Sequence, residues 1–482
     1  MDSRFRGNDK LNYMNQELKQ IKKIYFVGIK GVAMTALAIV AKEMGKEVRG
    51  SDVQEEFPTD ATLHRFKIAH VKNFSPEHIT DDIDLVVYTG AHQGVNNIEV
   101  QTAIKKGISV LPHGKALGLF MQGKKGISVA GSHGKTTTSA MIAHVLIQAG
   151  HDPSFAIGCG SITSLQTPAH AGSGDYFVAE ADEYVTDPTT DQTPRFLWQR
   201  PSVLVITNID FDHPDVYADL EAVKEAFADF TKQIRPGGFV VINVDDAAST
   251  SLLRRIEAKK ITFGKTATAD FQLIRVNFTG GRTNFQVKIN GQNESFALSV
   301  PGEHNALNAV AAIAVLLTLG LTIEQIRGGL ASFVGTKRRF EKISEKGGKL
   351  LYDDYAHHPA EISATLAGAR VWFPKRRIIA IFQPHTYSRT QALLKEFAAS
   401  FGAADVVLLT EIYASAREKP ILGISGRTLF NVTQKQKPST VFTPGKADVL
   451  QYLKQNSRPN DLILTMGAGN IFTWVPDILR II

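Results

Sequence analysis

A glycine turn between an apolar strand and an apolar helix constrains this chain more than any other feature of its sequence. Residues 124–146 read KKGISVAGSHGKTTTSAMIAHVL. The apolar residues Ile127, Val129 and Ala130 predict the end of a buried strand. Gly131–Gly134 form the turn, and a helix is expected from about Thr136 to Ala149. This order predicts a phosphate-binding loop, because the N–H groups of the turn and of the helix N-terminus can surround anionic oxygens.

The side chains of this loop also suit a nucleotide. Lys135 offers a positive charge to the β- and γ-phosphates, and the hydroxyl of Thr136 suits Mg²⁺. In the general pattern GxxxxGK[ST] the first glycine would fall at Val129, so this loop has the shorter form GxxGKTTT. An ordinary glycine turn is the alternative, but Gly-Lys-Thr-Thr-Thr directly after a strand favours the nucleotide site. Its predicted residues are Gly131, Ser132, His133, Gly134, Lys135, Thr136 and Thr137.

Composition narrows the class of protein. The chain has 482 residues, which suggests about three domains, and a net charge of +7 without an arginine-rich arm, so nucleic acid is not an expected partner. A single cysteine, Cys159, excludes an internal disulfide and agrees with a cytoplasmic location. The longest apolar run, Ala309–Leu317, is too short to span a bilayer, so no membrane association is expected. Residues 1–22 are predicted to be a disordered leader, within which Met14 is an alternative start.

Residues 23–123 are predicted to form a first α/β domain. A strand at Ile24–Val27, the turn Gly28–Gly31 and a helix over Val32–Met44 form a βαβ start, and the next strand ends at Ser51 and Asp52. The glycine spacing breaks the dinucleotide pattern GxGxxG, so a nicotinamide cofactor is disfavoured and the diphosphate of another nucleotide is favoured. Thr89, which follows the predicted strand 85–88, is expected at the same sheet edge.

Residues 124–334 are predicted to form a central domain around the phosphate loop. A strand leads into EADE (Glu180–Glu183), where an acidic side chain beside the loop is a candidate Mg²⁺ ligand. A second strand leads into NIDFDHPDVY, in which His213 lies among three aspartates; this setting favours a functional histidine over a packing one. Asn305 is expected either to cap a long helix or to contact a base.

Residues 335–482 are predicted to form a third domain. Apolar strands alternate with helices, and each strand ends in polar residues, as in KRRFE (337–341), DDYAHHP (353–359), FQPHTYSRT (382–390) and LTMGAGN (464–470). That alternation predicts a second doubly wound α/β unit whose loops gather at one edge.

Taken in order, GSHGKTTT, EADE, NIDFDHPD, GEHNALNA, KRRFE, DDYAHHP and FQPHTYSRT resemble the Mur ligases of bacterial cell-wall synthesis. The resemblance runs from about Ile24 to the C-terminus. It implies an α/β protein of three domains: a Rossmann-like N-terminal domain that binds the UDP substrate, a central P-loop ATPase-type domain and a Rossmann-like C-terminal domain that binds the amino acid. GIKGVAMTALA and the third-domain motifs look most like the branch that adds L-alanine to UDP-N-acetylmuramate in peptidoglycan synthesis.

This resemblance implies ATP and Mg²⁺ as cofactors, an acyl-phosphate intermediate, and a monomer or weak homodimer. It implies that Lys135, Glu180 and His213 are catalytic, with Thr136, Glu180 and His213 holding metal. Three further sets follow from it. ATP would also meet Asn305, Arg339 and Asp354; the UDP moiety would meet Gly28, Gly31, Ser51, Asp52 and Thr89; and the amino acid would meet Tyr355, His357, His385 and Arg389.

Three departures from the family pattern leave alternatives open. Several sister ligases carry a carbamylated lysine 14 residues after the histidine matching His213, and Phe227 stands there in this chain. Thr386 replaces an arginine found in many alanine-adding enzymes, which leaves Arg389 for the carboxylate. The segment between EADE and NIDFDH resembles the enzyme that attaches recycled tripeptide to UDP-N-acetylmuramate. The alternatives are therefore that tripeptide ligase and, from another class, a nucleotide-sensing regulator without ligase activity.

Overall fold

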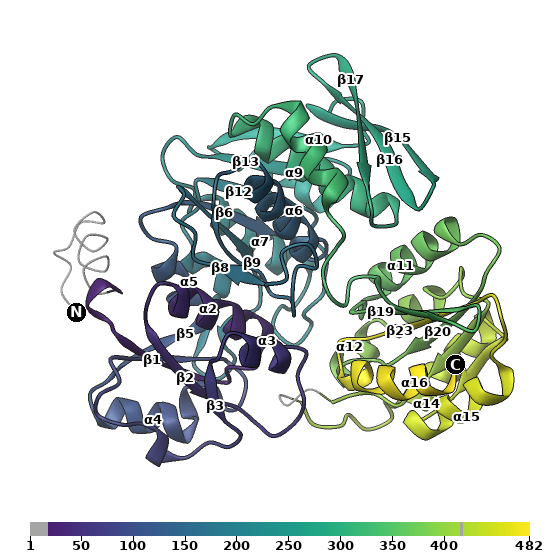
Figure 1. Cartoon of the computed structure of the whole chain (residues 1–482), viewed down its shortest axis with the longest axis horizontal. Coiled ribbons are helices and arrows are strands. Elements are labelled where there is room, and N and C mark those ends of the chain that lie inside the picture. Colours follow the sequence, from purple (N-terminus) through teal and green to yellow (C-terminus); the bar gives the residue numbers. More distant parts are fainter. Residues whose placement is uncertain (1–17, 415–417) are drawn as a thin grey trace. The chain divides into compact units, whose positions relative to one another are not determined.

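The computed structural model describes residues 18–414 and 418–482, which form two compact units. The first unit contains the described residues up to Asp210, together with Asp219–Gln272 and Ala309–Gly329. The second contains Phe211–Ala218, Leu273–Asn308 and Leu330–Ile482. Figure 1 labels the elements of both units.

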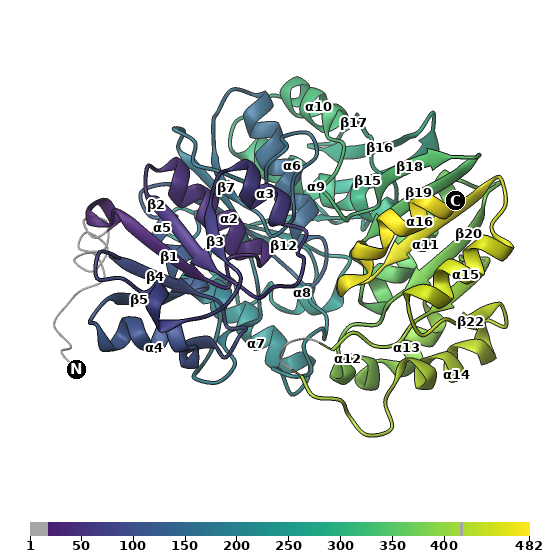
Figure 2. The same cartoon turned by 60° about the horizontal axis from the view of Figure 1, so that its bottom comes forward.

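The first unit begins with a parallel five-stranded sheet in the order β3-β2-β1-β4-β5, the arrangement expected for a Rossmann-like domain. Helices α2 and α3 lie on one face of this sheet and α4 on the other (Figures 1 and 2). The predicted strand and helix positions are confirmed, with small shifts at their ends. The strands are β1 Lys23–Val27, β2 Glu47–Ser51, β3 Ala69–Val71, β4 Leu85–Tyr88 and β5 Ser109–Pro112; the helices are α2 Val32–Glu43, α3 Asp60–Arg65, α4 Ile98–Lys105 and α5 His113–Phe120.

The last residues of the predicted leader belong to the core of this domain. Leu18 is buried in the same apolar cluster as α2, and the Lys46 ammonium donates to the carbonyls of Leu18 and Ile21 at 2.8 and 2.6 Å. Residues 1–17, where the rest of the predicted leader falls, lie outside the described residues.

A larger sheet carries the phosphate loop. Within the first unit its order is β14-β13-β12-β6-β9-β7-β8, and all neighbours are parallel except β7 and β8. The apolar strands are buried because helices cover the sheet, as is usual for parallel strands. The strands are β6 Lys125–Ala130, β7 Ser154–Ala156, β8 Ala169–His170, β9 Tyr176–Ala181, β12 Val203–Ile206, β13 Phe239–Asn243 and β14 Lys259–Gly264. The helices of the central region are α6 Lys135–Gln148, α7 Leu220–Thr231, α8 Ala247–Ser251, α9 Glu303–Thr318 and α10 Ile323–Ser332. Strands β10 Val185–Asp187 and β11 Asp191–Pro194 pair as a separate two-stranded antiparallel ribbon.

The second unit holds an antiparallel extension and the C-terminal sheet. The extension consists of β15 Phe271–Thr279, β16 Arg282–Ile289 and β17 Gln292–Leu298. The C-terminal sheet has the order β18-β19-β23-β20-β21-β22 and is parallel except at its edge strand β18. Its strands are β18 Glu341–Lys346, β19 Lys349–Asp354, β20 Arg377–Phe382, β21 Val406–Leu409, β22 Thr440–Phe442 and β23 Asp461–Met466.

Helices cover both faces of the C-terminal sheet, so the predicted doubly wound unit is confirmed. Buried residues of α11, α13 and α14 form one apolar core with the sheet, and residues of α15 and α16 form a second core. The helices are α11 Pro359–Trp372, α12 Tyr387–Ala392, α13 Leu394–Ala399, α14 Gly426–Gln436, α15 Lys446–Asn456 and α16 Val475–Ile481.

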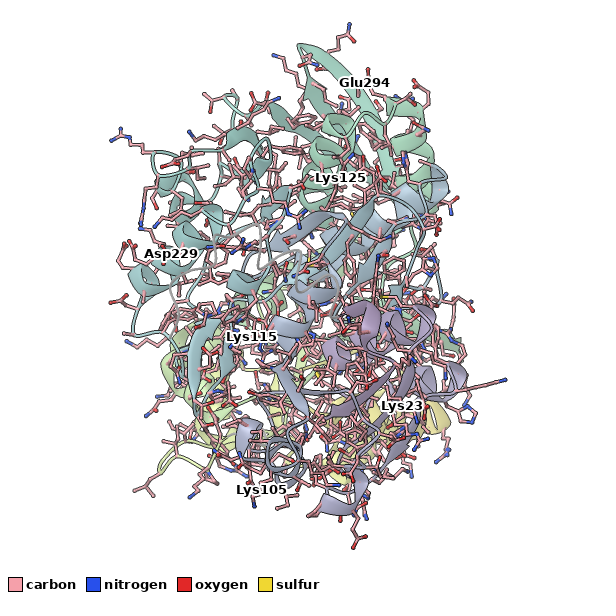
Figure 3. All side chains as sticks on the ribbon, turned by 90° about the vertical axis from the view of Figure 1, so that its left-hand side faces the viewer. Lys23, Lys105, Lys115, Lys125, Asp229 and Glu294 are labelled. Atoms are coloured by element: carbon pink, nitrogen blue, oxygen red, sulfur yellow. The ribbon has the colours of Figure 1, made fainter. Side chains whose placement is uncertain are left out.

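Charged side chains lie mostly at the surface, as for Lys23 and Asp229, which Figure 3 labels. Among the described residues, no helix combines the length and the apolar character that crossing a membrane requires.

One histidine joins the N-terminal sheet domain to the central sheet through two carboxylates. His170 on β8 contacts Glu43, the last residue of α2, at 2.8 Å through Nδ1 and Asp152 at 2.9 Å through Nε2. The hydrogen bond that His170 donates to Glu43 raises the pKa of His170, and hydrogen bonds donated by Ser173 help to lower the pKa of Asp152 to about 2. The contact is strongest when the imidazole and both carboxylates are charged.

We expect this contact to make stability depend on pH. Since the pKa of His170 is higher in the folded state, its stabilisation is fully present below the unfolded pKa of about 6.5 and is lost as pH rises through the folded pKa. Thermal unfolding should therefore show a larger Tm difference between wild type and His170→Gln at pH 6 than at pH 9. An equal difference at both pH values would contradict this reading. His64→Gln, at an exposed histidine on α3, is the control and should lower Tm little at either pH.

Candidate functional site

The phosphate loop follows β6 and opens α6. Helix α6 begins at Lys135, one residue earlier than predicted, after Gly134 with φ of 83°. Gly131 has φ of 134°, and a Cβ there would lie 2.0 Å from Thr207 Oγ1. Both glycines are therefore needed for the backbone path, as expected for a loop that must bring main-chain atoms close to a ligand.

Asn208, which follows β12, accepts hydrogen bonds from two amides of the phosphate loop. Its carbonyl accepts from the Ser132 amide at 3.0 Å, and its Oδ1 accepts from the His133 amide at 2.9 Å. These two amides of the turn therefore donate to protein oxygens, whereas the sequence predicts that the N–H groups of the turn face a ligand. The N–H groups of the first turn of α6 remain as donors that the helix itself does not satisfy.

Lys135 is held by Glu183, an acidic residue that the sequence reasoning did not single out. The Lys135 ammonium lies 2.9 Å from Glu183 Oε2 and 2.5 Å from the carbonyl of Gly131. Glu183 is buried, with only 2% of its side chain exposed. The ion pair with Glu183 holds the Lys135 ammonium close to the phosphate loop.

Glu180 and Thr136 lie in the first unit, where they suit a metal. Glu180 is near the carboxyl end of β9 and pairs in register with Val129 of β6, so it is next to the loop. A Cβ on Gly158 would lie 2.8 Å from Glu180 Oε2, so the backbone of residue 158 closely approaches this carboxylate. Thr136 is in the first turn of α6. A carboxylate and a hydroxyl are hard oxygen donors, and such donors fit Mg²⁺.

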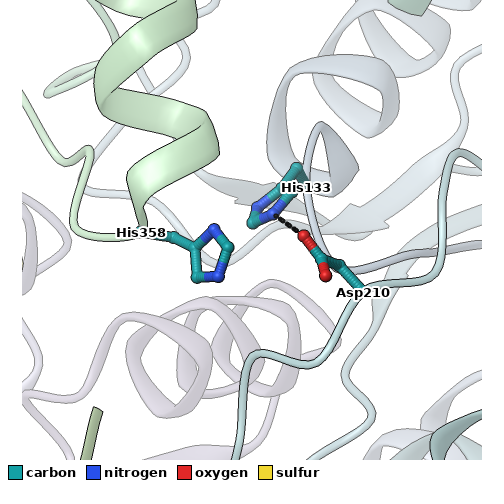
Figure 4. A group of neighbouring side chains, drawn as sticks. All are labelled: His133, Asp210 and His358. Carbon is teal, nitrogen blue, oxygen red and sulfur yellow. Dashed lines mark ion pairs between the residues drawn. The ribbon is translucent and has the colours of Figure 1, made fainter. Parts of the chain in front are cut away.

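His133 pairs with an aspartate beyond β12. Its Nε2 lies 3.6 Å from Asp210 Oδ2, the contact drawn as a dashed line in Figure 4. Ser132 Oγ accepts from the Asp210 amide at 2.8 Å. The loop is therefore tied at two successive residues to the segment after β12. His358, also drawn in Figure 4, belongs to the second unit.

The residues predicted to bind UDP come together at the carboxyl ends of β1, β2 and β4. The amide of Gly28 donates to the Ser51 carbonyl at 2.9 Å, and a Cβ on Gly28 would lie 2.3 Å from Thr89 Cγ2. Asp52 accepts from the Lys30 amide at 2.7 Å and is 1% exposed. Gly31 ends the same turn, so the structure places all five predicted residues at one edge, with Asp52 stabilising the turn from within.

A buried carboxylate lies behind this edge. Glu99 on α4 is fully buried and accepts from the hydroxyls of Tyr25 and Ser51. It also accepts from the Ser75 amide at 3.2 Å and contacts His78 Nδ1 at 2.6 Å. No sequence pattern predicts this network, because its members come from four separate segments.

The residues predicted to bind the amino acid lie close to one another in the second unit. The Tyr355 and His357 rings are 5.2 Å apart, and the His357 and His385 rings are 6.3 Å apart. Arg389 Nη1 approaches the His385 carbonyl at 3.5 Å. Burial lowers the pKa of His357 to about 4, so its imidazole is neutral at pH 7. The loops after β19 and β20 therefore form one polar cluster, as the sequence predicted.

Arg389 also forms an ion pair with the segment that contains His213. Its Nε lies 3.0 Å from Asp212 Oδ1, and only 7% and 8% of the two side chains are exposed. His213, the predicted metal ligand of this segment, follows Asp212 directly and belongs to the second unit. The acidic neighbours of His213 are evident in the sequence, whereas the pairing of Asp212 with Arg389, which are 177 residues apart, is not.

Two acidic residues at the end of β19 have separate roles. Asp353 pairs with Arg338 at 2.8 Å, and both are buried. Asp354 accepts from the amides of Phe340 and Ala356 at 2.7 Å each, and burial raises its pKa to about 6. The carboxylate of Asp354, predicted on the nucleotide side, is therefore engaged with backbone.

Arg339 and Asn305 have local partners. Arg339 Nη1 lies 3.4 Å from Glu361 Oε1, and its guanidinium lies 5.2 Å from the centre of the Tyr355 ring. The Asn305 amide nitrogen donates to the Pro301 carbonyl at 2.6 Å, just before α9. That contact favours a helix-end role for the amide of Asn305, while its role toward a base stays a prediction.

Backbone strain occurs beside these clusters. Arg338, Phe340 and Thr386 have φ of 59°, 51° and 71°, values that non-glycine residues adopt rarely. Thr386 directly precedes α12, which carries Arg389. Such strain is often found at binding sites, where the surrounding contacts enforce it.

Models of a single family match nearly the whole chain. The Mur ligase family catalytic-domain model matches residues 23–140, the Mur ligase middle-domain model matches 129–316, and the Mur ligase glutamate-ligase-domain model matches 338–469. The predicted domain limits at 123 and 334 stay a prediction.

Curated relatives match over a similar length. A UDP-N-acetylmuramate–L-alanine ligase of Desulfitobacterium hafniense is 43% identical over 93% of this chain and 97% of its own. The ligase of the same name from Caldanaerobacter subterraneus is 39% identical over 95% of this chain and 97% of its own.

Solved structures agree with these matches. A crystal structure of UDP-N-acetylmuramate-alanine ligase from Thermotoga maritima superposes with a TM-score of 0.79 and 28% identity, over 95% of this chain and 98% of that one. A murein peptide ligase from Psychrobacter arcticus gives 0.73 and 26%, with the same coverage.

Proposed function

Because the chain belongs to the Mur ligase family, we propose that it joins L-alanine to UDP-N-acetylmuramate at the expense of ATP. The observation that carries this proposal is the 43% identity, over 93% of the chain, to a relative named for that reaction. The product would be a precursor of peptidoglycan, so the protein would serve cell-wall biogenesis, cell shape and cell division.

The proposed reaction makes a poor electrophile reactive. The carboxylate of UDP-N-acetylmuramate is anionic and lacks a good leaving group, so it first takes the γ-phosphoryl group of ATP to give an acyl phosphate and ADP. The amine of L-alanine then attacks the acyl carbon, and phosphate leaves from the tetrahedral intermediate. One amide bond forms, and ATP is converted to ADP and phosphate.

The first unit would bind ATP and the UDP substrate. Lys135 would leave Glu183 to contact the phosphates, where its charge offsets the negative charge of the transferring group. Thr136 and Glu180 would hold Mg²⁺, and the resemblance to the family assigns a metal to His213 as well. A bound Mg²⁺ neutralises phosphate charge and orients the phosphoryl group. The turn at Gly28 would receive the UDP diphosphate.

The second unit would bind the amine. Arg389 would pair with the carboxylate of the amino acid, since a guanidinium can bind a carboxylate through two hydrogen bonds. Tyr355, His357 and His385 would enclose the small side chain. Burial lowers the pKa of His357 to about 4, so its imidazole would be neutral and could accept a hydrogen bond from the amino acid.

Release of phosphate tests the proposal. The protein would be mixed with ATP, Mg²⁺ and UDP-N-acetylmuramate, and L-alanine, glycine, L-serine or the tripeptide would be added in turn. Release that depends on L-alanine is the expected result. ATP binding without amine-dependent release would instead favour a nucleotide-sensing regulator.

A tripeptide ligase is the second candidate. The structural similarity to the murein peptide ligase from Psychrobacter arcticus supports it, with a TM-score of 0.73 against 0.79 for the alanine ligase from Thermotoga maritima. Release only with the tripeptide would establish this candidate and place the protein in cell-wall recycling.

The cellular setting belongs to the same proposal. We expect a cytoplasmic enzyme, because ATP and UDP-sugar substrates are available there, acting as a monomer or weak homodimer. Sedimentation velocity over a range of concentrations tests the oligomeric state. A stable tetramer would contradict it.

A further inference from the structure

The guanidinium of Arg389 is anchored on one side only. Its Nε donates to Asp212 Oδ1 at 3.0 Å and approaches the Asp212 carbonyl at 3.4 Å. Within the described part of the chain, the only hydrogen bond of its terminal nitrogens is a long one from Nη1 to the His385 carbonyl, at 3.5 Å. The outer edge of the guanidinium therefore keeps donors for a further acceptor.

Because Arg389 and Asp212 are buried, their charges need partners within the protein or the substrate. Arg389 is 5% exposed and Asp212 is 6% exposed. A guanidinium loses hydration when it is buried and needs charged or hydrogen-bonding partners in return. Asp212 supplies a counter-charge, and the remaining Nη donors suit the two oxygens of a carboxylate.

The backbone turns directly after Asp212. The amides of Val216 and Tyr217 both donate to the His213 carbonyl, at 3.0 and 2.9 Å, and so close a turn directly after Asp212. Two successive residues of this segment would then serve different substrates. His213 would bind the metal, and Asp212 would contact the arginine that binds the amino acid.

We infer that Asp212 is a positioning residue for the amino acid: it anchors Nε of Arg389 so that the Nη edge is presented to the substrate carboxylate. This inference rests on the proposed function, since it names the group that Arg389 binds. The recognised group is the free carboxylate of a small α-amino acid. Asp212 Oδ2 also lies 3.7 Å from His213 Nε2, whereas its proposed effect on the amino acid is exerted through Arg389.

The test separates amino-acid binding from turnover. Asp212→Ala should raise KM for L-alanine about 10- to 100-fold, the effect expected for loss of a charge-assisted hydrogen bond, with a smaller change in kcat. Asp212→Asn retains an acceptor oxygen and should raise KM less, which is the rescue expected of a positioning role. L-Alaninamide lacks the carboxylate, so its KM should change little in either variant.

The controls distinguish the possible failures. Asp215→Ala alters an exposed aspartate of the same segment and should leave KM for L-alanine within twofold of wild type. Wild-type protein that releases phosphate with L-alanine, combined with an unchanged KM in Asp212→Ala, would overturn the inference alone. An equal rise in KM for L-alaninamide would also overturn it. If Asp212→Ala does not fold, the same comparison with Asp212→Asn decides. No release by wild type with any amine would overturn the proposed function.

Discussion

Replacing Lys135 with alanine is expected to lower kcat by about 1,000-fold while leaving the fold intact. A preorganised positive charge at a transferring phosphoryl group contributes factors of about this size. The loss corresponds to about 4 kcal/mol of transition-state stabilisation. Alanine-dependent phosphate release measures the effect, and circular dichroism checks the fold.

A lysine outside the site provides the control. Lys125 begins β6, five residues before the loop, and its side chain is 61% exposed. Lys125→Ala removes the same charge from the same strand–loop segment and should keep wild-type kcat. Turnover of Lys135→Ala at the wild-type rate would show that the phosphate-loop assignment is wrong.

The second large effect concerns stability. Phe227→Ala is expected to reduce the free energy of unfolding by about 3–5 kcal/mol, the usual cost of removing a fully buried phenylalanine. Phe227 on α7 is fully buried, and its ring lies 5.2 Å from that of Phe196 in an edge-to-face contact. The position that carries a modified lysine in several sister ligases is therefore part of an apolar core here.

Chemical denaturation of the full chain measures this change. Leu220→Ala, on the same helix but 37% exposed, should cost less than about 1 kcal/mol. If Phe227→Ala and Leu220→Ala lose equal stability, the packing around Phe227 does not contribute as described. Phe227→Lys should be at least as harmful as alanine, because it would place an ammonium group at a fully buried position packed against an aromatic ring.

Strands and strand-end motifs could be predicted because their signals are local. Apolar runs such as 203–206 and 378–382 are bounded by polar residues, and parallel strands place those residues at one edge. The phosphate loop and the cluster around His357 and His385 were found in this way. Helix ends shifted by a residue or two, as for α6, because several residues there can begin or end a helix.

The partners of these motifs could not be predicted in the same way. Asp212 and Arg389 are 177 residues apart, and Lys135 and Glu183 are 48 residues apart. No periodicity links such pairs, since the contact depends on how the strands are ordered in the sheet. The burial of Leu18 could not be predicted for a related reason. A single apolar residue in a polar segment has no periodic pattern that would indicate its packing on α2.

In the hydrogen-bond network around Glu99, substitution of the acceptor should destabilise the fold more than substitution of any one donor. Four donors from three separate segments share the two oxygens of one carboxylate. Loss of the Tyr25 hydroxyl still leaves the carboxylate satisfied by the others, so the fold should tolerate change on the donor side. Loss of the carboxylate deprives buried donors of their acceptor together. The sheet edge that contains Ser51 therefore depends on Glu99 more than on any one of the donors that contact it.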